Sequence, residues 1–469
     1  MKPTLIVCAA ALLVGGCATF EPQVVSPAEQ AARLESRTLD SPQLRAFIER
    51  NAAQPLEAWP PPQWDLDLLT LAALYYHPDL DVARAKWGVV QAGAVTAGMR
   101  PNPSLGFSAL HNPGSLVGMS PWTLGLSLDI PIETAGKRGY RIQQANHLSE
   151  AARLAIASTA WQVRSRVRAA IGDWQVAQQT GEALLRQQRL QADNVTLLEH
   201  RLSTGAASNP EVTQARIALN QSTLAVGEAR RLQADARARL AAALGLSAKA
   251  LDGVGITPAT ASEPAVVTAK EAREALLHRA DVLGALAEYA ASQSALQLEI
   301  ANQYPDIHLG PGYTWDQGSN KWSLGLTVTL PLMNQNEGPI AEAKAKRLQA
   351  VAVFNATQAR ALAELDAAFA NYEASRQTLS VADSLAVAQT DQLRKVRSSF
   401  AAGEIDRGVL LGTQLEMAQL ELTRIDAAAK AQQALAGLED ATQWPLLAPA
   451  LRRVETVQNN PRPTEEQNP

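Results

Sequence analysis

The chain has 469 residues, a net charge of −4 and an isoelectric point near 6.0. This charge balance argues against a nucleic-acid-binding protein, which would carry a concentrated basic face. Hydrophobic residues make up 46% of the chain and aromatic residues only 5%, so Ala and Leu supply most of the apolar content, as expected for long helices rather than a large β core.

The first 17 residues have the pattern of a lipoprotein signal peptide. Lys2 supplies a positive charge, the segment 5–14 is apolar but too short to span a membrane, and two glycines precede Cys17. We predict cleavage before Cys17 and acylation of its sulfur, which anchors the protein to lipid. Ala18 at the next position favours the outer over the inner membrane. An ordinary signal peptide with an incidental cysteine is the alternative. The only other cysteine is Cys8, so no disulfide and no thiolate metal site is expected in the body of the chain.

An internal repeat dominates the rest of the chain. The segment 122–132 matches 322–332 at an offset of 200, with five of eleven positions identical. Matching landmarks lie on both sides, because 77–80 aligns with 279–282 and 201–205 with 399–403. Units of this length indicate a tandem duplication rather than a solenoid. The predicted organisation is a lipoprotein signal peptide (1–17), an N-terminal extension (18–64), a first repeat (65–248), a linker (249–269), a second repeat (270–445) and a polar, disordered tail (446–469).

Within each repeat the sequence predicts the same elements in the same order. A helix of moderate length is followed by two strands flanking a Gly/Pro/Asn-rich loop, a very long helix, a tight Gly-containing turn and a shorter return helix. About 60 residues of helix extend roughly 90 Å, too far to be buried in a compact domain. Small residues spread over a wide arc favour a helix with neighbours on two sides. The predicted helices are 66–99, 140–202 and 210–244, then 270–303, 340–400 and 407–438, with turns at 203–209 and 401–406.

The second strand of each repeat alternates strictly between apolar and polar residues. Such a pattern fits a hairpin packed on a soluble helical core as well as a strand in lipid. Helices of roughly 90 Å cannot cover these strands, which favours lipid. Unpaired strand edges are not tolerated in lipid, so strands of several copies of the chain must join. The predicted lipid-facing residues are Trp122, Leu124, Leu126, Trp322, Leu324 and Leu326; the opposite face carries Thr123, Ser127, Asp129, Thr327 and Thr329.

These features together resemble the outer-membrane efflux protein (TolC) family, over about residues 60–445. The resemblance rests on the duplicated order of elements, the lipoprotein signal peptide ending before Cys17, the segment 100–103 (Arg-Pro-Asn-Pro) and the two Gly-containing turns. The segment 131–141 is similar to the branch that serves heavy-metal cation exporters. The implied fold is mainly α with a small β part. Its duplicated β-β-α-α units form a homotrimer in which twelve strands close a membrane β-barrel, continued by a long periplasmic α-helical barrel.

The resemblance also implies a function and partners. The protein is expected to be lipid-anchored in the outer membrane and to extend into the periplasm. There it would conduct exported solutes, metal cations or drugs, passively to the exterior. A periplasmic adaptor (membrane fusion protein) and an inner-membrane transporter of the resistance-nodulation-division (RND) type would be its partners. A lipid-anchored periplasmic coiled-coil scaffold without a pore is the alternative.

The family places its closed end at the two turns. The residues expected to contact the adaptor are Ser203, Thr204, Gly205, Ala206 and Ser208 in the first turn, and Ala402, Gly403, Glu404 and Asp406 in the second. Asp391, Arg394 and Arg397 are candidate gate residues. This segment departs from the family, because Arg394, Lys395 and Arg397 make it basic where an acidic gate is often expected.

Catalytic and metal-binding patterns are missing from the sequence. The six histidines form no His-x-x-x-His pair, and no phosphate-binding loop, nucleophile motif or dinucleotide fingerprint is present. We therefore expect no enzymatic activity, no cofactor, no selective metal site and no nucleic-acid partner.

Overall fold

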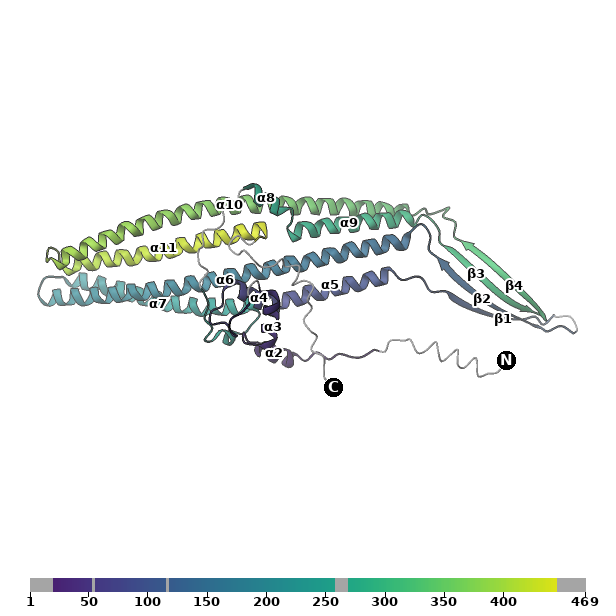
Figure 1. Cartoon of the computed structure of the whole chain (residues 1–469), viewed down its shortest axis with the longest axis horizontal. Helices are drawn as coiled ribbons and strands as arrows, with labels where there is room; N and C mark the ends of the chain where they lie inside the picture. Colours follow the sequence, from purple (N-terminus) through teal and green to yellow (C-terminus); the bar gives the residue numbers. More distant parts are fainter. Residues whose placement is uncertain (1–19, 53–54, 115–117, 258–268, 445–469) are drawn as a thin grey trace.

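A computed structural model describes residues 20–52, 55–114, 118–257 and 269–444. The predicted Cys17 lipid anchor and the tail 446–469 lie outside these ranges. The molecule is elongated, with a β-sheet at one end and paired long helices running to two tips at the other (Figure 1). The prediction of a mainly helical fold with a small β part is confirmed.

The four strands form one antiparallel sheet in the order β1-β2-β3-β4. Their bounds are β1 Ser104–His111, β2 Trp122–Ile132, β3 Ile307–Asp316 and β4 Ser319–Val328. The two repeats therefore join side by side through β2 and β3, and β1 and β4 lie at the edges. The expected loop between the strands of the second repeat is absent, because Gln317 (φ 49°) and Gly318 (φ 105°) alone make a two-residue hairpin turn.

The first helix of each repeat was predicted as one segment, and that prediction is wrong. The structure has α4 Leu66–Tyr76 followed by α5 Pro78–Ala97, and α8 Ala269–Leu276 followed by α9 Ala280–Ala301. In the first repeat Pro78 excludes the helical conformation at His77, whose backbone is extended (φ −71°, ψ 125°). In the second repeat Arg279 is extended (φ −60°, ψ 135°) and donates a 2.8 Å hydrogen bond to the Ala441 carbonyl oxygen.

The long helices are confirmed. Helix α6 (Lys137–Ser203) has 67 residues and α10 (Glu337–Ala401) has 65, so each extends roughly 100 Å at 1.5 Å per residue. The return helices α7 (Asn209–Leu244) and α11 (Arg407–Thr442) run back beside them. None of the helices in the described part of the chain combines the length and apolar character needed to cross a membrane.

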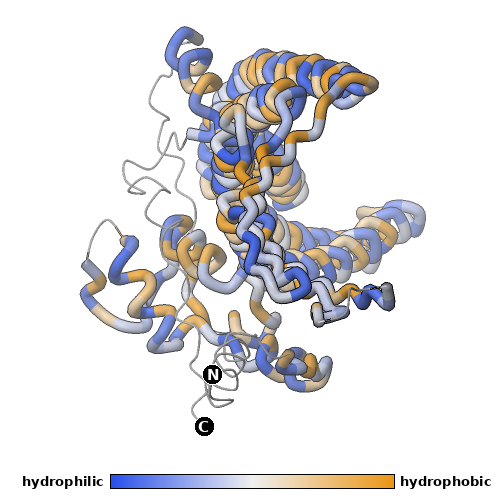
Figure 2. Tube along the Cα trace, turned by 90° about the vertical axis from the view of Figure 1, so that its right-hand side faces the viewer, coloured by the Kyte–Doolittle hydropathy of each residue, from blue (hydrophilic) through white to orange (hydrophobic). Residues whose placement is uncertain are grey.

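The helices continue the order of the strands. Next to the sheet, neighbouring helices are α5-α6-α9-α10, and toward the tips they are α7-α6-α11-α10. Viewed along the long axis, they form an open arc rather than a closed bundle (Figure 2). One edge of the arc is α5 and α7, and the other is α10.

The main hydrophobic core lies halfway along the molecule, where α4 and the N-terminal extension pack on α6 and α7. The extension forms two short helices, α2 (Pro27–Glu35) and α3 (Pro42–Asn51), which sequence analysis did not predict. Leu44 and Ile48 of α3 are fully buried in this core. Trp64 pairs with Ile256, beyond the short 3-10 helix η1 (Ala248–Leu251), so both ends of the first repeat are fastened at this level.

Candidate functional site

The sheet has one apolar face that is open to the surroundings. Cross-strand pairs on this face are apolar on both sides, such as Phe107 with Leu126 and Tyr313 with Trp322. Trp322 is 82% exposed although it is a large apolar side chain. All six residues predicted to face lipid (Trp122, Leu124, Leu126, Trp322, Leu324, Leu326) lie on this face and are exposed. Contact with lipid itself stays a prediction.

The opposite face of the sheet is polar and flat. Glycines of one strand lie opposite serines of the next, and a Cβ atom at Gly106, Gly125 or Gly312 would come within 2.7 Å of a serine Oγ. The face also carries two carboxylates that bind polar side chains. Thr123 donates a 2.8 Å hydrogen bond to Asp316, and His308 lies beside Asp129. Of the predicted polar-face residues, Thr329 falls just after β4.

Charged residues fasten the sheet to the long helices. Lys137, the first residue of α6, donates a 2.8 Å hydrogen bond to Asp306 just before β3. Thr134 binds the same carboxylate through its backbone N–H at 3.0 Å. Arg138 donates to the Gly98 carbonyl oxygen at the end of α5 (2.6 Å). The sheet and the helical arc are therefore held in one continuous wall at this junction.

At the far end, the structure brings the two predicted tips together. The turn after each long helix contains a left-handed glycine, Gly205 (φ 74°) after α6 and Gly403 (φ 76°) after α10. Asp406 caps α11 by accepting hydrogen bonds from the backbone N–H groups of Gly408 and Val409. The other carboxylate oxygen of Asp406 lies 3.1 Å from the guanidinium of Arg201 at the end of α6. The Val409 N–H, and after it Arg201, lower the pKa of Asp406.

The role of Arg201 could not be predicted from the sequence, because its partner lies more than two hundred residues further along the chain. The candidate gate residues on α10 are not part of this link. Arg394 pairs with Asp391 one turn away on the same helix (2.9 Å), and both side chains are exposed. Arg397 has no ion pair among the described residues. The remaining predicted tip residues lie in the two turns: Ser203, Thr204, Ala206 and Ser208 around the first, Ala402 and Glu404 around the second.

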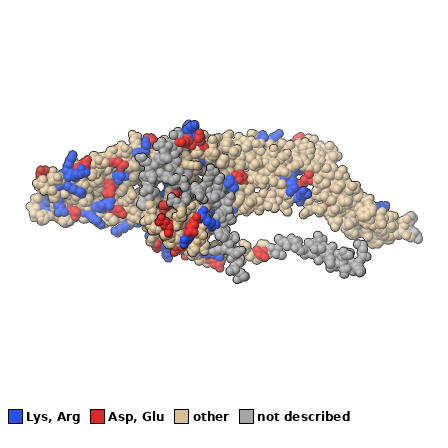
Figure 3. Space-filling view, in the orientation of Figure 1, with Lys and Arg blue, Asp and Glu red and all other residues tan. Residues whose placement is uncertain are grey.

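Charged side chains are unevenly distributed. On the face shown in Figure 3 they gather over the tip half, while the half next to the sheet is largely uncharged. In the part of the chain that the structure describes, no three His, Cys, Asp or Glu residues are placed to hold a metal ion together.

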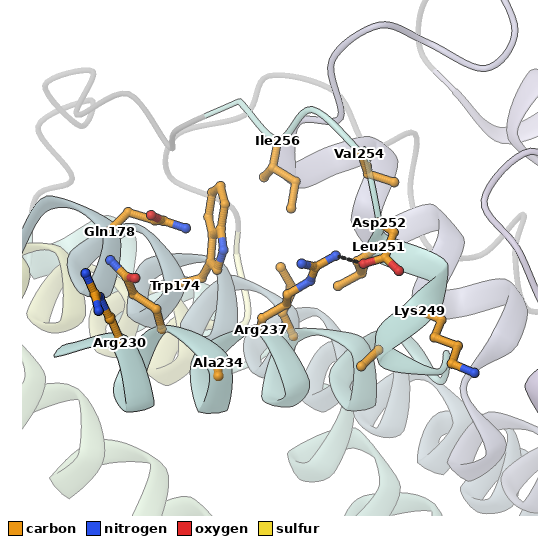
Figure 4. Close-up of a pocket in the computed structure, with 14 residues that line it drawn as sticks. Trp174, Gln178, Arg230, Ala234, Arg237, Lys249, Leu251, Asp252, Val254 and Ile256 are labelled. Atoms are coloured by element: carbon orange, nitrogen blue, oxygen red, sulfur yellow. Dashed lines mark hydrogen bonds and ion pairs between the residues drawn. The ribbon is translucent and has the colours of Figure 1, made fainter. Parts of the chain in front are cut away.

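A cavity of about 590 Å³ lies between α6, α7 and the loop after η1 (Figure 4). Trp174 forms one wall, and Leu251 and Ile256 contribute apolar surface. Arg237 projects into the cavity, where its guanidinium is paired with Asp252 (Figure 4). This pair fastens the loop after η1 to α7 at the margin of the main core.

A buried charged cluster joins α6 to α11. The Glu439 carboxylate is 0% exposed and accepts hydrogen bonds from Arg164 (3.1 Å) and from Arg168. The next carboxylate, Asp440, accepts from the indole N–H of Trp161. Burial raises the pKa of Asp440 although its hydrogen bonds oppose this. The last turn of the second repeat is thereby bound to the first.

Comparison with known proteins agrees with this architecture. The family model "Outer membrane efflux protein" matches residues 70–246 and 272–442, that is, both repeats. The cobalt-zinc-cadmium resistance protein CzcC of Cupriavidus metallidurans is 26% identical over 269 residues. That alignment covers 56% of this chain and 62% of CzcC.

Solved structures share the fold at low sequence identity. The outer membrane protein VceC of Vibrio cholerae matches with a TM-score of 0.65 and 20% identity, covering 81% of this chain and 96% of VceC. CusC matches with a TM-score of 0.68 and 17% identity, covering 91% of this chain and all of CusC. Because the family model spans both repeats, the chain belongs to the outer membrane efflux protein family, the TolC family.

Proposed function

We propose that the chain is the outer-membrane channel subunit of a tripartite efflux pump and that three copies form the channel. The observation that carries this proposal is the pair of open edges. Strands β1 and β4 leave backbone groups unpaired at the two edges of the sheet, and α5 and α10 are the corresponding edges of the helical arc. Edge strands in lipid require partners, and strands of a second copy supply them. Three copies of a four-stranded sheet give a closed sheet of twelve strands.

The edge helices support the same assembly. Val82 and Val89 are seven residues apart on α5, and both are exposed. Gly88 and Gly93 on this helix have open space where a Cβ atom would lie. On the other edge, Leu348 and Val381 of α10 are exposed. Small and apolar residues on an otherwise unpartnered helix face suit close packing against a neighbouring helix.

In the trimer the apolar face of the sheet faces lipid and the polar face lines a water-filled lumen. Solutes would pass through it by passive diffusion, with energy supplied by partners, so we propose no enzymatic role. The tip turns would meet a periplasmic adaptor, and an RND-type inner-membrane transporter would complete the pump. The name of CzcC, a cobalt-zinc-cadmium resistance protein, favours metal cations over drugs as cargo. Acylated Cys17 would hold the N-terminus at the outer membrane.

We further propose that the Arg201–Asp406 pair helps to keep the tips closed. It joins α6 of one repeat to α11 of the other, so opening of the tips by separation of these helices would break it. The pair is partly exposed, so it contributes little to overall stability. A weak link suits a gate that a partner protein must open.

Single-channel recording in planar bilayers tests the proposal. Purified trimers should give rare openings of low conductance, and Asp406→Asn should raise the open probability because it removes the charge that Arg201 binds. Asp426→Asn is the matched control, since it removes an exposed carboxylate paired within one helix (Lys430, 2.7 Å). Detergent-stable trimers without conductance in both proteins would instead support a periplasmic scaffold without a pore.

A further inference from the structure

His308 and Asp129 form a contact between the two repeats on the polar face of the sheet. His308 is the second residue of β3, and Asp129 lies near the end of β2. The imidazole Nδ1 atom is 3.1 Å from both carboxylate oxygens of Asp129. The His308 side chain is 39% exposed, so water and solutes reach the ring. The hydroxyl-bearing Thr327 lies opposite His308 in the β3–β4 register.

The chemistry of the pair determines which imidazole nitrogen is available. An ionised carboxylate can only accept hydrogen bonds, so Nδ1 must carry the proton. In the neutral ring the lone pair is then on Nε2, and Nε2 makes no hydrogen bond or ion pair with the described residues. Histidines that bind metal ions commonly donate their other ring N–H to a carboxylate, which fixes the tautomer and increases the basicity of the ligating nitrogen.

We propose that His308, oriented by Asp129, is a transient binding site for divalent transition-metal cations such as Zn²⁺ or Co²⁺. Imidazole nitrogen binds these ions well, whereas it binds Mg²⁺ poorly. The proposal rests on the function proposed above, which places the polar face in the lumen, and it names the cargo of that channel. A trimer would carry three such sites around the lumen.

A site with one strong protein ligand binds a metal ion with low affinity, and a conducting channel requires low affinity. Conduction needs binding that is strong enough to attract an ion and weak enough to release it. Water completes the coordination shell in such a site. Asp306, just before β3, is paired with Lys137 (2.8 Å), which leaves the histidine as the principal ligand. The site differs in this way from a closed structural metal centre.

The first test measures metal protection of individual histidines. Detergent-solubilised trimers are treated with diethyl pyrocarbonate, which modifies the free imidazole nitrogen, at increasing Zn²⁺ or Mg²⁺, and modification is quantified by peptide mass spectrometry. Zn²⁺ should protect His308 at lower concentrations than the exposed His200 and His278, which serve as internal controls. Mg²⁺ should not protect. In Asp129→Asn the Zn²⁺ concentration for half-protection should rise on the order of tenfold. Equal protection of all three histidines, or no change in Asp129→Asn, overturns the proposal.

The second test separates this inference from the channel function. Single-channel conductance is compared with and without millimolar Zn²⁺ in the unmodified protein and in His308→Ala. Zn²⁺ should reduce the conductance of the unmodified channel, and the relative reduction should be lost in His308→Ala. A conducting channel in which Zn²⁺ acts equally on both proteins contradicts the metal site and leaves the channel function standing. Trimers that never conduct contradict the channel function, and the protection experiment then decides on the site alone.

Discussion

In each repeat an ion pair joins the start of the shorter helix, α5 or α9, to the neighbouring long helix, but the two repeats place the positive and negative partners on opposite helices. In the first repeat His77 caps α5, and Asp79 in the first turn pairs with Arg166 of α6 (2.7 Å). In the second repeat Arg279 precedes α9 and pairs with Glu364 of α10 (2.9 Å). The positively charged partner is therefore on the long helix in the first repeat and at the start of the shorter helix in the second. With Arg166 nearby, a neutral histidine replaces the cationic arginine.

The protonation of His77 should therefore affect stability. Its Nδ1 atom accepts a hydrogen bond from the Asp79 backbone N–H (3.2 Å), which requires an unprotonated nitrogen. Burial lowers the pKa of His77, and the positive charge of Arg166 adds to this. A histidine with a lowered folded-state pKa contributes stability above its unfolded pKa of about 6.5, and this contribution is lost as the pH falls through the folded value.

We expect His77→Asn to reduce the loss of thermal stability on acidification. Asparagine keeps a capping oxygen and does not titrate, so the variant should lose less of its melting temperature between about pH 7 and pH 5 than the unmodified protein. The capping hydrogen bond at stake contributes on the order of 1 kcal/mol. His278→Asn, at an exposed histidine beside the matching position of the second repeat, is the control and should leave the pH dependence unchanged. Parallel pH profiles in all three proteins would contradict this assignment.

At the scale of elements, the contact between α6 and α11 holds the two repeats together along the tip half. The ion pairs that connect these helices lie in different surroundings. Glu439 is buried with Arg164 and Arg168 near the main core, whereas Glu421 pairs with Arg186 (2.6 Å) on the exposed surface. Removing one partner of a buried pair leaves an uncompensated charge in the interior, and removing an exposed one does not.

Glu439→Gln should therefore destabilise the protein by about 3 kcal/mol or more. Glu421→Gln, on the same two helices, should have an effect of about 1 kcal/mol at most. Thermal unfolding followed by circular dichroism measures both. Similar melting temperatures for the two variants would mean that the buried cluster does not hold α11 against α6.

At the scale of the whole molecule, the sheet and the helical arc of the single chain are open at both edges. Its apolar and small residues continue along α5 and α10, the helices at the two edges of the arc, where the described chain supplies no partner. Because β1 and β4 are also the edges of the sheet, the same two borders remain open over the sheet and the adjoining helices. In the proposed trimer, association across these borders would bury the apolar helix faces and pair the outer strands in one step.

Val89→Asp should accordingly prevent trimer formation. Val89 is 74% exposed in the single chain, and in the trimer its side chain would be buried against α10 of the neighbouring subunit. An unpaired carboxylate there costs several kcal/mol per interface. Val24→Asp is the matched control, since Val24 is 91% exposed and lies before α2, so it is not part of the edge helices α5 and α10. Native mass spectrometry of detergent-solubilised protein should show monomers for Val89→Asp and trimers for the control; trimers of both would place the interface elsewhere.

Local patterns in the sequence were sufficient for the strands, the long helices and their duplication. Alternation along 122–130 and 322–330 predicted the apolar and polar faces of the sheet correctly as far as β4 extends, to Val328, because the side-chain period of a strand depends only on neighbouring residues. Length and small-residue composition likewise predicted α6 and α10 to within a few residues. The breaks at His77 and Arg279 and the helices of the extension were not predicted. At His77 the following proline overrules helix propensity, and at Arg279 and in the extension contacts with distant parts of the chain do so.

The pairing of distant residues was decided only by the tertiary structure. Arg201 meets Asp406, and His308 meets Asp129 from 179 residues away, because the two repeats are placed side by side in a particular register. A shift of one residue in the register between β2 and β3 would turn His308 to the apolar face and break its contact with Asp129. Sequence periodicity determines which face a residue takes within its own strand or helix. The contact across repeats depends on how two independent elements are aligned, and no local pattern records that alignment.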